Sequence, residues 1–275
     1  MKIVADSASN VFSLDSVAFA SVPLKIITAQ AEYVDDEKLD VKTMVEQIKA
    51  TKGRTGTSCP NIHDWLEAFG EEAQVFAVTI TSNLSGSCAA AVQAKQAYEE
   101  SHPGARVHVI DTLSAGPEMR LVVEKLQQWI LEGKTFDQIC LAETEYRKNT
   151  GLLFSLESLT NFARNGRVNP AMAKVAGVLG IRIVGTASEQ GTLQQLHKCR
   201  GEKKALETLI TELQQRGFVG GKACISHSFN EPAAQELKNR ILARWPDSHV
   251  SIEQNGGLCC YYAEPGGLLI GFETE

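Results

Sequence analysis

The chain has 275 residues, of which 43% are hydrophobic and 22% are charged, as in an ordinary globular protein. This length favours two domains of roughly 100–150 residues each. A formal net charge of −6 argues against nucleic acid as the main partner, because binding to phosphates requires a basic surface.

The first half of the chain alternates strand and helix patterns. Strands are predicted over Lys2–Ala5, Pro23–Thr28, Val75–Ile80 and Val107–Asp111. Apolar residues at helical spacing predict helices over Val41–Ile48, between Ser114 and Gly133, and over Phe136–Arg147. This alternation predicts a largely parallel sheet with helices on its faces, and ligands of such sheets lie beyond the carboxyl ends of the strands.

The second half of the chain, beyond the polar cluster Arg147–Gly151, has a different pattern. Strands are predicted over Leu152–Leu156, Ile181–Ala187, Leu193–Cys199, Ala223–Ser228, Val250–Gln254 and Leu268–Phe272. Helices are predicted over Gly201–Arg216 and Glu231–Arg244. We therefore expect an α/β fold with two domains. Residues 1–149 would form a parallel-sheet α/β domain, and residues 150–275 an α+β domain with a mixed sheet.

Several features bear on the compartment. Met1-Lys2 leads directly into the first predicted strand instead of an apolar signal segment. The longest apolar stretch, Val175–Ala187, contains Arg182 and several glycines, so no membrane span is expected. The seven cysteines have no C-x-x-C spacing, which predicts neither a disulfide framework nor a zinc site. We expect a cytoplasmic protein without a metal or cofactor.

Two hydroxyl-rich segments are the best candidates for a binding site. Ser82–Ser87 follows a predicted strand and precedes an alanine-rich helix pattern, so its turn lies at a helix N-terminus, which favours an anion. Thr57 and Ser58 precede a second helix pattern. Neither segment carries a charge, which predicts neutral donors holding a small anionic headgroup such as a carboxylate. The alternative is that Ser58 is only a helix N-cap, with Pro60 in the first turn.

Other chemistries have weaker support. Ser85 lacks the preceding glycine of a G-x-S-x-G nucleophile elbow, and no histidine is placed as its base. A hydrolase that uses Ser85 or one of the cysteines is nevertheless an alternative function. Nucleotide binding is not indicated, since both G-x-G-x-x-G and the Walker motif are absent. Arg167 lies in a basic, glycine-centred turn, which is either a helix cap or a cationic rim near the headgroup.

Five segments occur in the order and spacing of a known set of motifs. They are Lys2–Ser9 (compare I-V-T-D-S-T-S), Val22-Pro23-Leu24 with Tyr33-Val34-Asp35 (V-P-L…Y-x-D), Thr57–Pro60 (T-S-Q-P), Ser82–Ser87 (S-x-L-S-G-T) and Asn165–Val168 (G-G-R-I). Together they resemble the DegV family of bacterial fatty-acid-binding proteins over nearly the whole chain.

This resemblance implies a non-enzymatic protein that binds a long-chain, palmitate-like fatty acid. It implies an acyl chain buried between or within the domains, with the carboxylate held by Thr57, Ser58 and Ser85. Gly86, Arg167 and Tyr262 complete the expected ligand-binding residues. Some relatives present the bound acid to a separate fatty-acid kinase, which makes an acyl phosphate for phospholipid synthesis, so such a kinase is the implied partner.

The chain departs from the family in its last motif. The family pattern is G-T-H-A-G-P-G, and the matching stretch here is Cys260–Gly266, with Tyr262 in place of the histidine and Glu264 in place of a glycine. A phenol can donate a hydrogen bond to a carboxylate, whereas Glu264 near the headgroup would repel one. An interaction protein with a decayed pocket is therefore a further alternative.

Overall fold

The computed structural model describes residues 1–51, 53–168, 172 and 180–274. Its N-terminal part contains a four-stranded parallel sheet of strand order β2-β1-β6-β7. The strands are β1 (Lys2–Asp6), β2 (Ala18–Val22), β6 (Gln74–Thr79) and β7 (Arg106–Asp111). The predicted parallel sheet is thus confirmed. A short 3-10 helix, η1 (Ser7–Ser9), follows the first strand.

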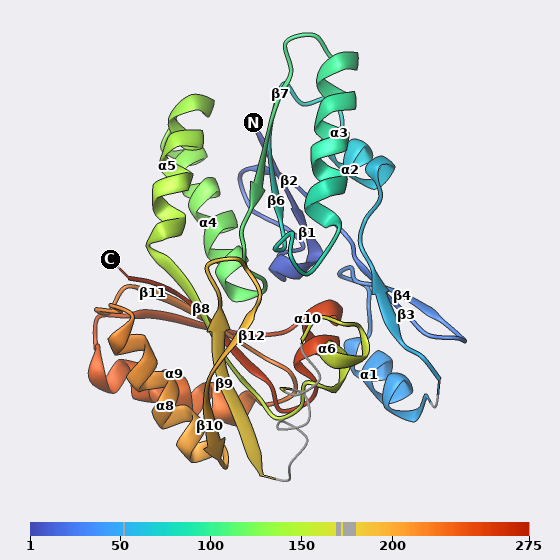
Figure 1. Ribbon diagram of the computed structural model, residues 1–275. Coiled ribbons are helices and arrows are strands. Elements are labelled where there is room, and N and C mark those ends of the chain that lie inside the picture. Colours follow the sequence, from blue (N-terminus) through green and yellow to red (C-terminus); the bar gives the residue numbers. More distant parts are fainter. Residues whose placement is uncertain (52, 169–171, 173–179, 275) are drawn as a thin grey trace.

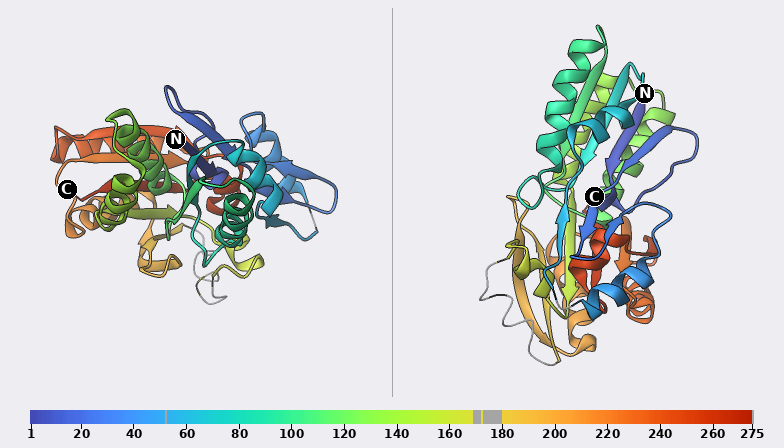
Figure 2. Two further views of the ribbon diagram at one scale, coloured as in Figure 1. Left: turned by 90° about the horizontal axis from the view of Figure 1, so that it is seen from above. Right: turned by 90° about the vertical axis from the view of Figure 1, so that its right-hand side faces the viewer.

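Helices cover both faces of this sheet (Figures 1 and 2). One face packs against α2 (Ile62–Phe69) and α3 (Ser87–Ser101). The other face packs against α4 (Pro117–Leu131) and α5 (Phe136–Lys148). The sheet is therefore buried on both sides, which is the usual arrangement for parallel strands.

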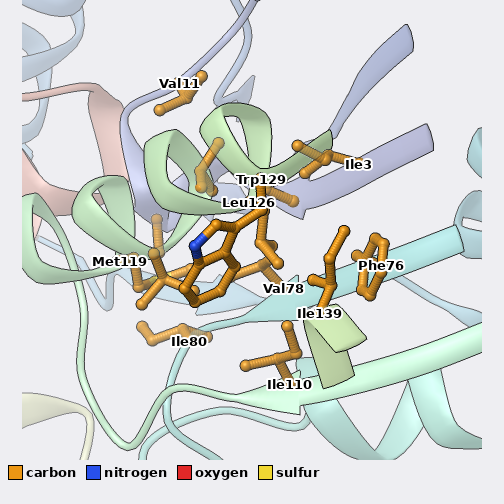
Figure 3. Close-up of a cluster of buried hydrophobic side chains, with 14 of the residues drawn as sticks. Ile3, Val11, Phe76, Val78, Ile80, Ile110, Met119, Leu126, Trp129 and Ile139 are labelled. Carbon is orange, nitrogen blue, oxygen red and sulfur yellow. The ribbon is translucent and has the colours of Figure 1, made fainter. Parts of the chain in front are cut away.

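Side chains along a strand alternate between these two layers. Phe76 and Val78 of β6 belong to the cluster under α4 and α5, whereas Val75 and Ala77 belong to the cluster under α2 and α3. Figure 3 shows residues of the first cluster, among them Leu126 and Trp129 of α4 and Phe76 and Val78 of β6. This packing holds the carboxyl ends of the strands, from which the polar loops start, in fixed positions.

A second, three-stranded antiparallel sheet corrects one prediction. The expected strand Pro23–Thr28 does not join the parallel sheet; it shortens to β3 (Lys25–Ile27), between β4 (Glu32–Val34) and β5 (Gly56–Ser58). The parallel edge strand is instead β2, which ends immediately before Pro23. Proline has no N–H for a ladder and interrupts the strand there. The helix α1 (Val41–Ala50) follows β4.

The C-terminal part contains a six-stranded mixed sheet of order β10-β9-β8-β13-β11-β12, in which only β11 and β12 pair in parallel. This confirms the expected mixed sheet. Its strands are β8 (Thr150–Leu156), β9 (Ile181–Ala187), β10 (Leu193–Arg200), β11 (Lys222–His227), β12 (His249–Gln254) and β13 (Leu268–Glu273).

Helices cover this sheet as well. Helices α8 (Glu202–Gln215) and α9 (Glu231–Arg244) cover one face, as Figure 1 shows. The short helices α6 (Thr160–Arg164) and α10 (Gly257–Ala263) pack against the mixed sheet in a smaller hydrophobic cluster. Helix α10 also packs against α1 and β3. The proposed division at residues 149 and 150 stays a prediction.

Across residues 1–51, 53–168, 172 and 180–274, no helix has the length and apolar character needed to cross a membrane. Of the apolar stretch Val175–Ala187, residues 175–179 lie outside the described part of the chain, and Ile181–Ala187 forms β9.

Candidate ligand-binding site

A cavity of about 260 Å³ lies where the strand ends of the parallel sheet meet the mixed sheet and α10. This volume exceeds the ~150 Å³ of an engineered apolar cavity that binds benzene. Most of its wall is apolar, with side chains from both parts of the chain: Leu24, Ile80, Leu84, Leu152, Phe154, Leu156, Phe162, Leu193, Leu258 and Leu269. The cavity is therefore suited to an apolar ligand.

All six residues predicted from the sequence line this cavity: Thr57, Ser58, Ser85, Gly86, Arg167 and Tyr262. We call these six the polar cluster. Gly86 is exposed and the others are half-buried, whereas the wall residues Phe154 and Leu258 are 3% and 2% exposed. Six of the ten apolar wall residues are buried, and Leu84, Phe162, Leu193 and Leu269 are half-buried like most of the polar cluster. The apolar wall thus extends from the level of the polar cluster into the buried part of the protein. That these residues hold a ligand stays a prediction.

The loop of residues 80–87, between β6 and α3, supplies Ser85 and Gly86. Its backbone N–H groups are mostly occupied: those of Leu84 and Ser85 donate to Thr81 O, both at 3.2 Å. Ser87 N donates to Ser85 Oγ at 3.2 Å. Within this loop, Gly86 N makes no hydrogen bond to any described residue. In residues 80–87, the donors left for a ligand therefore include the amide of Gly86 and the neighbouring Ser85 hydroxyl.

Thr57 and Ser58 lie on strand β5, not at a helix start. Helix α2 begins later, and its N-cap is Asn61, whose Oδ1 accepts from His63 N at 2.7 Å and from Asp64 N at 3.1 Å. The alternative interpretation of Ser58 as an N-cap is therefore wrong. An asparagine side chain serves the same purpose three residues further on, which leaves the hydroxyls of β5 available for another role.

Tyr262, on α10, contacts the strand that carries Thr57. The Tyr262 hydroxyl lies 2.8 Å from Thr57 Oγ1, and its ring centroid lies 4.7 Å from that of Phe162. Burial raises the pKa of the Tyr262 phenol, so it stays a neutral donor at physiological pH. Tyr262 thus lines the cavity and brings a neutral hydroxyl that can donate or accept a hydrogen bond.

Arg167 follows α6 and reaches across to the loop of residues 80–87. Its Nε donates to Leu84 O at 3.1 Å, and its Nη1 donates to Asn165 O. Among the described residues that line the cavity, Arg167 alone carries a charge. The turn also caps α6, because Gly166 N donates to Ala163 O at 3.1 Å and Arg167 N donates to Phe162 O at 2.8 Å. The helix-cap interpretation is thus confirmed, and a cationic rim near a headgroup stays a prediction.

Glu264 does not behave as expected. It is not among the residues that line the cavity. Its Oε1 accepts from Ser158 Oγ at 2.8 Å and from Asn161 N at 3.1 Å, at the beginning of α6. The expectation that Glu264 would repel a carboxylate in the site is therefore wrong, because its charge is directed to the N-terminal turn of a neighbouring helix.

Two acidic residues at strand ends, Asp6 and Asp111, accept hydrogen bonds from the loop of residues 80–87. Asp6 Oδ2 accepts from Ile80 N at 2.9 Å and from Ser87 Oγ at 2.6 Å. Asp111 Oδ1 accepts from Ser82 N at 3.1 Å. Asp6 is fully buried, and burial raises its pKa to about 7.

Cys59 lines the cavity and was not named as a site residue. It is exposed, and its Sγ lies close to Gly86: a Cβ added to that glycine would meet it at 3.0 Å. The sequence signal that could have identified Cys59 as a cavity residue is its position directly after Thr57 and Ser58. The hydroxyl pattern indicated the segment, but it did not show that the thiol faces the same cavity.

The lining gives little support to hydrolysis. Ser85 has no imidazole or carboxylate beside it in the cavity wall, as far as the described lining residues show. Burial raises the pKa of the thiols of Cys224 and Cys260 to about 12 and that of Cys259 well above its usual range, which disfavours the reactive thiolates. No group of three or more His, Cys, Asp or Glu side chains within the described ranges could hold a metal ion.

Comparisons with known proteins agree with this architecture. A family model for DegV, a family of uncharacterised proteins, matches residues 1–275. A DegV domain-containing protein of Streptococcus pneumoniae is 42% identical over 278 residues, covering 100% of this chain and 99% of the relative.

Two solved structures share the whole fold. A DegV family protein from Eubacterium eligens, loaded with heptadecanoic acid, has a TM-score of 0.98 and 45% identity, with 100% of each chain covered. The fatty acid kinase B3 protein of S. pneumoniae, loaded with linoleic acid, has a TM-score of 0.98 and 42% identity, covering 100% of this chain and 99% of that one. The match of the family model along the entire chain, together with these relatives, shows that the chain belongs to the DegV family.

Proposed function

We propose that this protein binds a long-chain fatty acid non-covalently, with the carboxylate at the polar cluster and the acyl chain along the apolar wall. The observation that carries the proposal is that one cavity combines a partly exposed polar cluster with an apolar wall, most of which is buried. A molecule with one polar end and one long apolar end matches this combination. The acids bound by the relatives from E. eligens and S. pneumoniae have this form.

The energetics favour a lipid over a small polar anion. Burial of an acyl chain contributes ~0.8 kcal/mol per CH₂, or on the order of 10 kcal/mol for a palmitoyl tail. The loss of translational and rotational freedom on association, and the ordering of the acyl chain, offset several kcal/mol of this gain. Each neutral hydroxyl adds roughly 1 kcal/mol, which is enough to orient a headgroup but too little to hold a small anion alone.

The charge of the polar cluster supports a singly charged headgroup. Arg167 brings one positive charge, and Thr57, Ser58, Ser85 and Tyr262 bring neutral hydroxyls. A carboxylate has one negative charge and two oxygens that accept several hydrogen bonds. We therefore assign the carboxylate to the space between Ser85 and Arg167, within reach of Thr57.

The proposed role is that of a carrier without catalysis of its own. The relative named fatty acid kinase B3 protein supports a separate kinase as the partner, which would phosphorylate the carboxylate while the tail stays enclosed. All seven cysteines are free, as in a reducing compartment, and this supports the cytoplasm as the place where the carrier acts.

The hydrolase alternative makes a different prediction. A nucleophilic Ser85 would be labelled by a fluorophosphonate, and the label would disappear in Ser85→Ala. We expect no such labelling, because none of the described lining residues is a histidine, aspartate or glutamate that could act as the general base.

Mass spectrometry of the purified protein, in the native state and after organic extraction, tests the proposal. We expect a co-purifying fatty acid of one main mass. Ala187→Phe narrows the cavity and should abolish co-purification, whereas the same change at the exposed Ala243 of α9, outside the cavity, should not. A protein that is empty and also rejects added palmitate and oleate would contradict the proposal.

A further inference from the structure

Both ends of the loop of residues 80–87 are hydrogen-bonded to the buried carboxylate of Asp6. At its start, Ile80 N donates to Asp6 Oδ2 at 2.9 Å. At its end, Ser87 Oγ donates to the same oxygen at 2.6 Å. The other oxygen, Oδ1, accepts from Ala8 N at 3.2 Å. Asp6 is the last residue of β1, the strand beside β6, so its side chain reaches the point where the loop leaves the sheet.

We propose that Asp6 is a positioning residue of the headgroup site, which sets the place and the orientation of Ser85 and Gly86 by holding both ends of the loop that carries them. This inference rests on the proposed function, because it assigns a role within the same site. Asp6 itself is absent from the cavity wall and is fully buried, so it acts through Ser87 and Ile80 and not by contact with the ligand.

The chain of contacts from Asp6 to the cavity is short. Ser87 is buried, and its hydroxyl is fixed by Asp6. Ser87 N in turn donates to Ser85 Oγ at 3.2 Å. Because Ser85 Oγ accepts this bond, its own proton is free to be donated to a ligand. The neighbouring Gly86 amide also makes no bond to a described residue, so two donors are left for a carboxylate.

Asp6 gathers neutral donors and has no described cation beside it. The three groups that donate to it are neutral, and no ion pair is formed by Asp6 with any described residue. A buried carboxylate without a cation is costly, and an apolar side chain would fill such a core position more cheaply. A carboxylate is required where several donors must be gathered at one point, and here these donors are the two ends of the ligand loop.

Asparagine is the matched substitution. It has the shape of aspartate but offers one acceptor oxygen and one NH₂ group. Since Asp6 accepts through both oxygens, an asparagine in its place must direct its NH₂ group toward at least one of the present donors. Asp6→Asn therefore weakens either the bond from Ala8 N or the attachment of the loop, without opening a cavity. Ser87→Ala removes only the attachment at the loop's end.

The experiment measures headgroup selectivity in the full-length chain. Dissociation constants for oleate and for oleyl alcohol are determined by displacement of the neutral probe N-phenyl-1-naphthylamine. In Asp6→Asn and in Ser87→Ala we expect oleate to bind about tenfold more weakly and the alcohol to change less than twofold. The double variant should lose less than the product of the single losses, because both changes act on the same contact.

Tyr98→Phe is the control for general destabilisation. Tyr98 lies in the same part of the molecule, outside the cavity, and its hydroxyl donates to Gly70 O and Glu72 O, both at 3.0 Å. Its loss should lower stability but leave the ratio of the two dissociation constants unchanged. This ratio separates a positioning role from a structural one.

Each outcome has one meaning. A ratio that stays at the wild-type value in both Asp6→Asn and Ser87→Ala would overturn the inference while leaving the fatty-acid proposal intact. A wild-type protein that binds neither oleate nor the alcohol would instead contradict the proposed function. If Asp6→Asn fails to fold, Ser87→Ala decides the question, because it removes a single hydrogen bond.

Discussion

The hydroxyl of Tyr262 lies 2.8 Å from Thr57 Oγ1, and this contact joins α10 in the C-terminal part to β5 in the N-terminal part. A parallel contact of 2.8 Å links the adjacent Tyr261 to Thr55. Thr57 and Tyr262 both line the cavity. When the phenol donates to Thr57, the proton of Thr57 is free for a ligand, and hydrogen bonds in such a chain strengthen one another.

Removal of the Tyr262 hydroxyl tests this chain of hydrogen bonds from Tyr262 through Thr57 to the ligand. Tyr262→Phe should weaken the binding of oleate by about three- to tenfold, the value of one hydrogen bond. Tyr262→His restores the residue of the family motif and should keep more of the affinity, because an imidazole can also donate to Thr57. Displacement titrations with both variants provide the comparison. A Phe variant as tight as the wild type would mean that Thr57 holds the ligand without help from the phenol.

Ser85 is expected to donate directly to the carboxylate. Ser85→Ala should weaken fatty-acid binding roughly tenfold and cost less than about 1 kcal/mol of stability, because only one weak bond from Ser87 N is lost. Ser82→Ala is the control, since Ser82 belongs to the same loop but does not line the cavity. Fluorescent fatty-acid titrations and urea unfolding check both numbers. Equal affinities for the two variants would remove Ser85 from the site.

Secondary-structure elements that depend on residues adjacent in the chain were predicted from the sequence. Strand β6 was predicted one residue from its position, because its apolar run and the polar turn after it are adjacent in the chain. Helix α10 was not predicted. It begins with glycine, and its first amides, from Gly257 and Leu258, donate to Asp35 at 2.6 and 3.1 Å. A carboxylate more than 200 residues away in the sequence thus completes this helix, and no local pattern shows it.

In the candidate site, too, residues in local motifs were predicted, and contacts between residues distant in the sequence were not. The hydroxyls of Thr57 and Ser85 were found because each lies in a short recognisable motif. Tyr262 was also expected in the site, from its motif. Its contact with Thr57 and the contact of Asp6 with Ser87 were not predicted, because they span 205 and 81 positions. The wrong expectation for Glu264 has the same origin: its partner Ser158 is 106 positions away.

Cys59 offers a direct measure of occupancy. Its thiol is exposed and lines the cavity beside Gly86, so a carboxylate bound in the polar cluster should cover it. We expect oleate to slow the alkylation of Cys59 by iodoacetamide at least fivefold. Cys140, on α5 and outside the cavity wall, is the internal control and should react at an unchanged rate. Peptide mass spectrometry follows both sites; equal rates at Cys59 with and without oleate would place the ligand elsewhere.

The buried acid Asp6 makes stability depend on pH. Burial raises its pKa to about 7 from the ordinary value of 3.8. The folded state then holds this proton more tightly than the unfolded state. The stabilisation is complete below about pH 4 and is lost as the pH rises through 7, by up to about 1.4 kcal/mol per pH unit.

Comparison with Asp6→Asn isolates this contribution from those of other groups, such as His227, whose pKa burial lowers. The difference in unfolding free energy between wild type and Asp6→Asn should be most in favour of the wild type at pH 5 and should shrink toward pH 8. Urea unfolding at four pH values measures it. A difference that is constant, or that grows with pH, would show that Asp6 is ionised in the folded state throughout this range.

Glu264 sits in a backbone conformation that suits glycine, the residue of the family motif. Its φ of 55° and ψ of 162° fall in a region that costs other residues about 1–3 kcal/mol. The side chain offsets this strain through its bonds to Ser158 Oγ and Asn161 N. Glu264→Ala keeps the strain and loses both bonds, whereas Glu264→Gly loses the bonds and relieves the strain.

We therefore expect the Gly variant to be more stable than the Ala variant by about 1–3 kcal/mol and to lie close to the wild type. Thermal and urea unfolding of the three proteins measure this order. An Ala variant as stable as the Gly variant would show that the backbone at this position carries no strain. In that case the glutamate would be retained only for the beginning of α6, which leads to the turn that carries Arg167.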